Sequence, residues 1–160
     1  MNASINQTLL ALLVTTVLLP AAQAQADDSA AIKQPALDYI EGWYEGNAER
    51  MERALHPELA KRIVEKKRGS DEVVLDSMDA KSLIAATAKG GGKNTPPEKQ
   101  QKDVTILDVF ENAAAVKVVA SGWVDYMQMA KWNGRWVIIN VLWEMKPKTA
   151  STEPKPEARS

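Results

Sequence analysis

The sequence predicts a single α+β domain in which helices come first and an antiparallel sheet follows. Apolar residues recur at three- and four-residue spacing in the first half of the chain, which is typical of amphipathic helices. The last third, from Asp103 to Lys146, has the pattern of four strands separated by short turns. The length of 160 residues leaves room for one domain, and the near balance of 20 basic and 21 acidic residues argues against a nucleic-acid partner.

The first 24 residues carry no charged side chain and predict a secretory signal peptide. The apolar run from Thr8 to Leu19 is shorter than the roughly 20 residues that a membrane-spanning helix needs. Small residues fit peptidase cleavage near Ala24 or Ala26. A signal peptide usually has a Lys or Arg before its apolar run, and this sequence has none. An uncleaved membrane anchor is therefore the alternative. We therefore expect a periplasmic or secreted protein with no stable membrane span after cleavage.

The rest of the chain divides into three parts by composition. Residues 25–31 predict a flexible leader, and residues 147–160 have the Pro, Lys, Glu and Ser content of a disordered tail. Residues 32–146 carry the periodic patterns of a folded domain. The chain has no cysteine and one histidine, so the sequence predicts neither disulfides nor a metal site, and no motif predicts a cofactor.

Two helices are predicted at the start of the domain. Apolar residues from Ile32 to Tyr44 form one helical stripe, which Gly46 ends. Asn47 is a suitable N-cap for a second, short helix. We expect that helix to end at His56-Pro57, because a residue before proline avoids the α region.

A strand pair and a third helix are predicted next. The runs Leu59–Glu65 and Val73–Met78 are separated by a polar turn and favour a strand pair, although a helix stays open for the first run. The segment from Asp79 to Lys89 predicts a helix with Asp79 as its N-cap. The glycines after it, residues 90–92, follow a helix instead of preceding one, so they do not form a phosphate loop; a lid over a pocket is the milder interpretation.

The sheet is predicted as a meander of four strands. We expect these strands at Asp103–Phe110, Ala113–Ser121, Trp123–Trp132 and Arg135–Glu144. The pair Asn133-Gly134 is typical of a type I′ hairpin turn, which needs positive φ at both central residues.

Alternation in the last strand predicts a sheet that is apolar on both faces. Side chains of a strand point alternately to either face, so Trp136 and Trp143 are expected on opposite sides. Three helices cannot cover both faces, and an uncovered apolar face requires a partner. The simplest expectation is a homodimer that forms through the sheet.

Several stretches resemble a known superfamily. They are Asp38 to Met51, His56-Pro57, Asp125-Tyr126, and Trp132 to Asn140. Together with the order of elements, they resemble the nuclear transport factor 2-like superfamily, and within it the branch labelled putative lumazine-binding proteins. The resemblance covers residues 32–146. It implies a cone-shaped α+β fold in which a curved antiparallel sheet packs on three N-terminal helices around a pocket.

The resemblance also implies which side chains surround that pocket. The expected pocket residues are mostly aromatic: Tyr39, Trp43, Tyr44, His56, Tyr126 and Trp136. Aromatic side chains can stack on a planar heterocycle, although most aromatics at such spacing only build the core.

Two residues are candidates for catalysis. His56 could shuttle protons near neutral pH, or it could simply cap the helix end. Asp125 could act as a base beside Tyr126, but neighbours in a strand point to opposite faces, so at most one of the two can reach a given pocket. A structural role for Asp125 is the alternative.

Three functions follow as expectations. The first is an exported binding module whose pocket takes a small apolar or aromatic molecule. The second is a pocket enzyme of ketosteroid-isomerase or polyketide-cyclase type, with His56 or Asp125 as its base. The third is an interaction scaffold in the cell envelope, which a pocket filled by the protein's own side chains would favour.

Overall fold

A computed structural model describes residues 21–147, with side chains from residue 28 onward. Residues 1–20, which hold most of the predicted signal peptide, and residues 148–160 of the predicted tail lie outside the described residues. The elements in chain order are α1 (Ala21–Glu45), α2 (Ala48–Ala54), β1 (Leu55–Lys66), β2 (Val73–Asp79), α3 (Ala80–Ala88), a 3-10 turn (Pro97–Lys99), β3 (Lys102–Phe110), β4 (Ala113–Ala120), β5 (Trp123–Trp132) and β6 (Arg135–Met145).

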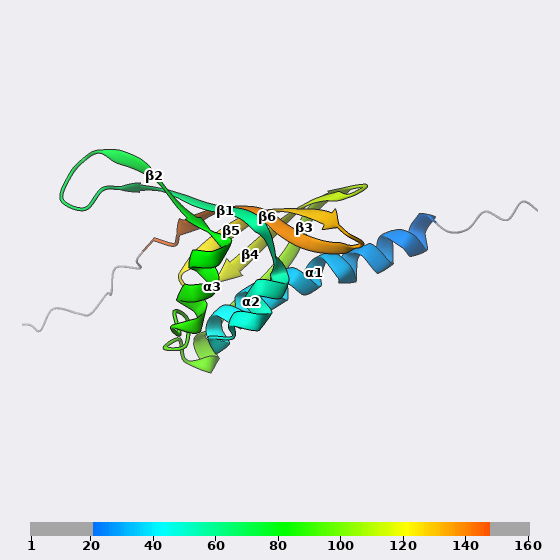
Figure 1. The fold of residues 1–160 in the computed structure, drawn as a ribbon, viewed down its shortest axis with the longest axis horizontal. Coiled ribbons are helices and arrows are strands. Elements are labelled where there is room, and N and C mark those ends of the chain that lie inside the picture. Colours follow the sequence, from blue (N-terminus) through cyan, green and yellow to red (C-terminus); the bar gives the residue numbers. More distant parts are fainter. Residues whose placement is uncertain (1–20, 148–160) are drawn as a thin grey trace, which may run out of the picture.

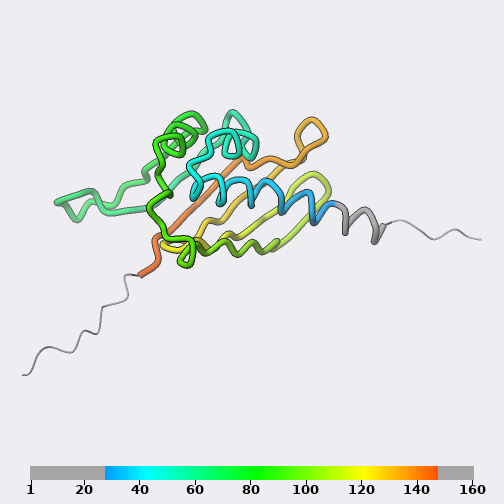
Figure 2. The backbone as a smooth tube through the Cα atoms, turned by 90° about the horizontal axis from the view of Figure 1, so that it is seen from below, coloured from blue at the N-terminus to red at the C-terminus, as the bar shows by residue number. Residues whose placement is uncertain are grey.

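All three α-helices lie on one face of a single six-stranded sheet (Figures 1 and 2). The strand order is β2-β1-β6-β5-β4-β3. The predicted α+β architecture, with three helices upstream of the meander, is therefore confirmed. The sheet is mixed and not wholly antiparallel, because β1 runs parallel to β6. The β1–β2 hairpin projects beyond the rest of the sheet (Figure 1).

The first helix starts earlier than the sequence predicts. α1 begins at Ala21, so residues 25–31 are helical where a flexible leader is expected. Alanine is the best helix former, and it occupies many positions of this segment. Pro35 lies inside α1. None of the helices in the part of the chain that the structure describes combines the length and the apolar character of a membrane span.

The predicted caps and the hairpin turn are confirmed. The Asn47 side chain accepts a hydrogen bond from the Arg50 N–H, and that of Asp79 accepts one from Ser82. Asn133 and Gly134 have φ values of 49° and 79°, as a type I′ turn requires. The second helix ends at Ala54, before His56-Pro57, because the chain enters β1 directly at Leu55.

A β-bulge changes the faces of the last strand. Gln128 pairs with Asn140 and Met129 with Ile138, so Ile139 is an extra residue in β6. A one-residue shift moves every following side chain to the other face. Trp136 and Trp143 therefore both pack against the core beneath the helices, and the prediction that they lie on opposite faces is wrong.

The hydrophobic core fills the space between the helices and the sheet. It includes Ile32, Ile40, Met51, Val116, Val118, Met127, Met129 and Ile138, all with at most 2% of their surface exposed. The inward face of β5 is formed by alternate residues, with Asp125 among them at 0% exposed. One carboxylate is thus buried in the same layer as the apolar core.

Candidate functional site

A small pocket lies between the helices and the sheet. Its volume is about 290 Å³. Side chains from α1, β1, β2, α3, β5 and β6 line it: Tyr39, Trp43, Lys61, Met78, Leu83, Trp123, Trp143 and Met145. All of these are apolar or aromatic except the single ammonium group of Lys61.

Aromatic rings form much of the pocket wall. Trp43 and Trp123 meet edge to face, with ring centroids 6.3 Å apart and planes inclined by 82°. The Lys61 ammonium lies 4.6 Å from the centre of the Trp143 ring, which is within the range of a cation–π contact. The pocket therefore offers flat apolar surfaces around one cation.

A buried hydrogen-bond network holds Lys61 in place. Its Nζ donates to Asp125 Oδ1 over 2.6 Å and to the Tyr39 hydroxyl over 2.8 Å. The Tyr39 hydroxyl donates to the same carboxylate oxygen over 3.2 Å, and Trp123 Nε1 donates to Asp125 Oδ2 over 2.6 Å. Every partner of Asp125 is thus a protein group that itself lines the pocket.

Burial shifts the ionisation of this network. It raises the pKa of Tyr39 well above its ordinary value, and the neighbouring Asp125 carboxylate raises it further. Burial lowers the pKa of the Lys61 ammonium, an effect that the charge and hydrogen bond of Asp125 oppose. Tyr39 therefore stays a neutral phenol, and its hydroxyl group donates a hydrogen bond to the Asp125 carboxylate.

The network leaves one polar group for a ligand. An ammonium has three N–H donors, and two of those on Lys61 serve Asp125 and Tyr39. The remaining donor is on the one charged side chain that lines the pocket. Asp125 lies behind these side chains and does not line the pocket. The arrangement can bind the acceptor atom of a flat molecule, and it does not present a carboxylate to that molecule.

The structure separates the residues that the sequence analysis groups together. Tyr39 and Trp43 line the pocket. Tyr44 packs beside Trp123, and its hydroxyl is bound to Ser121 and the Gln101 carbonyl.

The other three expected residues lie elsewhere. Tyr126 is on the opposite face of the sheet and 50% exposed, because it neighbours the inward-pointing Asp125 in β5. His56 packs edge to face on Trp132 and accepts a hydrogen bond from the Glu58 N–H. Trp136 lines a separate cleft near the β5–β6 hairpin.

Lys61 is the main residue that the sequence analysis missed. It occupies an inward position of β1, between the buried Leu59 and Ile63. A lysine at an apolar position of an alternating strand is a detectable signal, since lysine is almost never buried without a partner. The partner itself, Asp125, is 64 residues away and could not be found from local pattern.

Comparisons with known proteins place this geometry in a class. An NTF2-like protein of unknown function from Methylobacillus flagellatus has 21% identity and a TM-score of 0.60, covering 82% of this chain and 98% of its own. One from Shewanella baltica has 17% identity and a TM-score of 0.57, covering 77% and 97%. A "Putative Scytalone Dehydratase" from Novosphingobium aromaticivorans has 10% identity and a TM-score of 0.52, covering 78% and 88%.

These similarities establish the fold. The three helices, the curved mixed sheet and the pocket between them define a nuclear transport factor 2-like domain. The model of the family described as "Putative lumazine-binding" matches residues 27–144, and the chain belongs to that family. No curated protein sequence matches the chain.

Proposed function

We propose that the protein is an exported binding module that holds a small planar heterocycle in the pocket beside Lys61. The single observation that carries this proposal is the Lys61 ammonium, fixed by Asp125 and Tyr39 in an otherwise apolar and aromatic cavity. The proposal of export rests on the uncharged, partly apolar segment of residues 1–24. Identifying the N-terminal residue of the mature protein shows whether this segment is cleaved and so tests export.

The shape of the pocket supports a one- or two-ring ligand. A volume of about 290 Å³ is just below the range of ligand pockets for drug-sized molecules, roughly 300–1,000 Å³, so it suits a smaller ligand. Trp43, Trp123 and Trp143 offer ring faces and edges, and Lys61 would bind a carbonyl or ring nitrogen of the ligand. Lumazine, the molecule in the family's description, has this chemistry.

The two alternative functions have less support from the geometry. The enzyme alternative names His56 or Asp125 as the base, and neither lines the pocket. The scaffold alternative expects a pocket filled by the protein's own side chains, whereas a cavity is present.

Replacing Trp143 should weaken ligand binding because its ring forms one wall of the pocket. We expect lumazine to quench the tryptophan fluorescence of the mature protein. In Trp143→Leu the Kd should rise about tenfold, the size expected when a stacking partner and its buried area are lost.

Trp132→Leu is the matched control, since Trp132 is 50% exposed and does not line the pocket. Its Kd for lumazine should equal that of the wild type. Absence of lumazine binding by the wild type, or equal weakening in both variants, would contradict the proposed ligand class.

We also propose that two copies associate through the sheet face that bears no helix. Leu107, Tyr126 and Leu142 are 52%, 50% and 54% exposed on this face. They line a shallow groove of about 510 Å³, together with Arg62. An exposed apolar patch with a polar rim is typical of an interface.

A charge in this groove should separate the two copies. We expect the wild type to sediment as a dimer at micromolar concentration and Tyr126→Glu to sediment as a monomer, because the dimer would bury the new carboxylate. Lys33→Glu, on the exposed side of α1, should remain dimeric. A monomeric wild type contradicts the dimer.

A further inference from the structure

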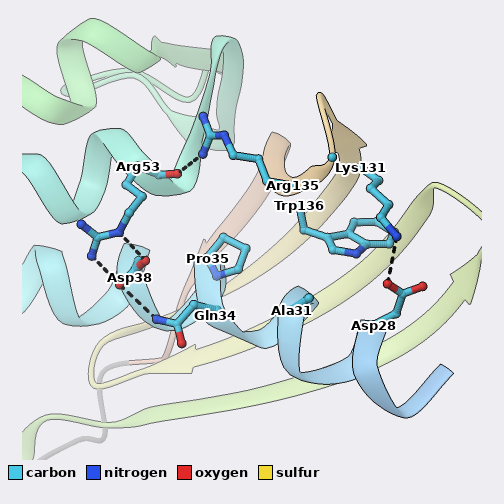
Figure 3. Close-up of a pocket in the computed structure, with 10 residues that line it drawn as sticks. Asp28, Ala31, Gln34, Pro35, Asp38, Arg53, Lys131, Arg135 and Trp136 are labelled. Atoms are coloured by element: carbon cyan, nitrogen blue, oxygen red, sulfur yellow. Dashed lines mark hydrogen bonds and ion pairs between the residues drawn. The ribbon is translucent and has the colours of Figure 1, made fainter. Parts of the chain in front are cut away.

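A second cleft opens between α1 and the β5–β6 hairpin (Figure 3). Its volume is about 620 Å³. Its walls combine the Trp136 indole, Pro35 and Ala31 with five charged side chains: Asp28, Asp38, Arg53, Lys131 and Arg135. It shares no lining residue with the pocket beside Lys61.

The Trp136 side chain, which forms one wall of this cleft, holds a buried polar atom without a partner. The residue is 4% exposed, and its Nε1 has no hydrogen-bond partner. It is the one such side-chain atom found among residues 28–147. An unpaired buried donor is unfavourable, and such exceptions are found where a structure serves a function as well as stability.

The helix opposite the indole also has an interrupted hydrogen-bond pattern. Pro35 has no N–H, so the carbonyl of Ala31 lacks its usual donor four residues later in α1. Ala31 and Pro35 both line the cleft, and the Trp136 ring extends from β6 toward Lys131, away from Pro35 (Figure 3). Between the charged groups, the wall of the cleft is largely apolar, because Ala31, Pro35 and Trp136 form it.

The carboxylates of the cleft are already paired. Asp38 accepts hydrogen bonds from Arg50, Arg53 and Gln34. Burial acts to raise the pKa of Asp38, but the hydrogen bonds and charges of Arg53 and Arg50 outweigh it and hold the pKa below its ordinary value. Asp28 is paired with Lys131 over 3.1 Å. Neither carboxylate is left to bind a cation.

The guanidinium groups, in contrast, have donors to spare. Arg135 has no carboxylate within salt-bridge distance among residues 28–147, and its one described hydrogen bond goes to the Arg53 carbonyl over 2.7 Å. Arg53 binds Asp38 through Nε and one terminal nitrogen, which leaves the other terminal nitrogen. Two arginines thus meet at one end of the cleft with unused N–H groups (Figure 3).

We propose that this cleft is a binding site for a small aromatic carboxylate. The carboxylate is held by the guanidinium groups of Arg135 and Arg53, because the planar fork of arginine matches its two oxygens. The ring of the ligand lies against the exposed edge of the Trp136 indole and against Pro35. The inference is independent of the pocket beside Lys61.

The indole N–H signals in a proton–nitrogen NMR spectrum test this site directly. The probe is 4-hydroxybenzoate, which carries an acceptor at the far end of the ring from its carboxylate. Trp136→Phe identifies the Trp136 signal. We expect 4-hydroxybenzoate to shift that signal in a saturable way, and the neutral analogue 4-hydroxybenzamide to leave it in place.

A matched pair of arginine variants completes the experiment. In Arg135→Gln the Kd for 4-hydroxybenzoate should rise roughly ten- to hundredfold, as the loss of charge-assisted hydrogen bonds predicts. Arg62→Gln, on the opposite face of the sheet, should bind like the wild type. An unmoved Trp136 signal, an unchanged Kd in Arg135→Gln, or a shift of the Trp123 signal alone would overturn the site, the last by placing the probe in the other pocket.

Discussion

Replacing Lys61 by methionine is expected to lower the free energy of unfolding by about 3–5 kcal/mol. The substitution leaves the Asp125 carboxylate, which is 0% exposed, without its counter-ion. The hydrogen bonds from Tyr39 and Trp123 would remain, but neither carries a positive charge. Urea denaturation of the wild type and Lys61→Met measures the difference directly.

Two further variants isolate the cause of this loss. Lys66→Met removes an ion pair from the same strand, but Lys66 and Asp71 are 67% and 98% exposed, so the change should cost no more than about 1 kcal/mol. Adding Asp125→Asn to Lys61→Met removes the unpaired charge and should restore part of the stability. If Lys61→Met were as stable as Lys66→Met, the buried pair would not have the role assigned to it.

A single methyl group at Gly92 is expected to cost about 1–3 kcal/mol of stability. A Cβ there would lie 2.4 Å from Trp43 Cδ1 and 2.5 Å from the Trp43 carbonyl oxygen. The carbonyl cannot move without distorting α1, and the ring would have to turn into the pocket that it lines. Thermal and urea unfolding of Gly92→Ala should therefore both shift downward, and lumazine binding should weaken with them.

Gly122→Ala is the control for this substitution. A Cβ at Gly122 would have no atom within 4 Å, so its stability should stay within about 0.5 kcal/mol of the wild type. Equal stability of Gly92→Ala and Gly122→Ala would contradict the close packing of the glycine loop on Trp43. The loop, which the sequence suggested as a lid, supports one wall of the pocket from behind.

The parts of the fold that depend on neighbouring residues could be predicted from sequence. Asn47 and Asp79 are N-caps because their short polar side chains accept from N–H groups three residues ahead. The Asn133-Gly134 turn follows from the positive φ that both residues tolerate. Such signals act within a few residues, and a single sequence displays them fully.

The candidate site could be predicted only in part, because it depends on a bulge and on contacts between residues that are far apart in the chain. One extra residue, Ile139, reverses the facing of Trp143, and nothing in an apolar run marks where a bulge falls. Tyr39 and Asp125 were visible as polar groups, but their contact spans 86 residues. The Lys61–Asp125 pair depends on the parallel alignment of β1 with β6, which no short pattern encodes.

That alignment has a consequence for how the molecule assembles. β6 lies between β1 and β5, so the strand made last occupies the middle of the sheet. Until Arg135–Met145 emerges, the early hairpin and the later meander have no edge in common, and the loop that must close between Ala60 and Asn140 is about 80 residues long. The complete sheet can therefore form only after residues 135–145 have been synthesised, so the two parts of the sheet should gain their stability together and late.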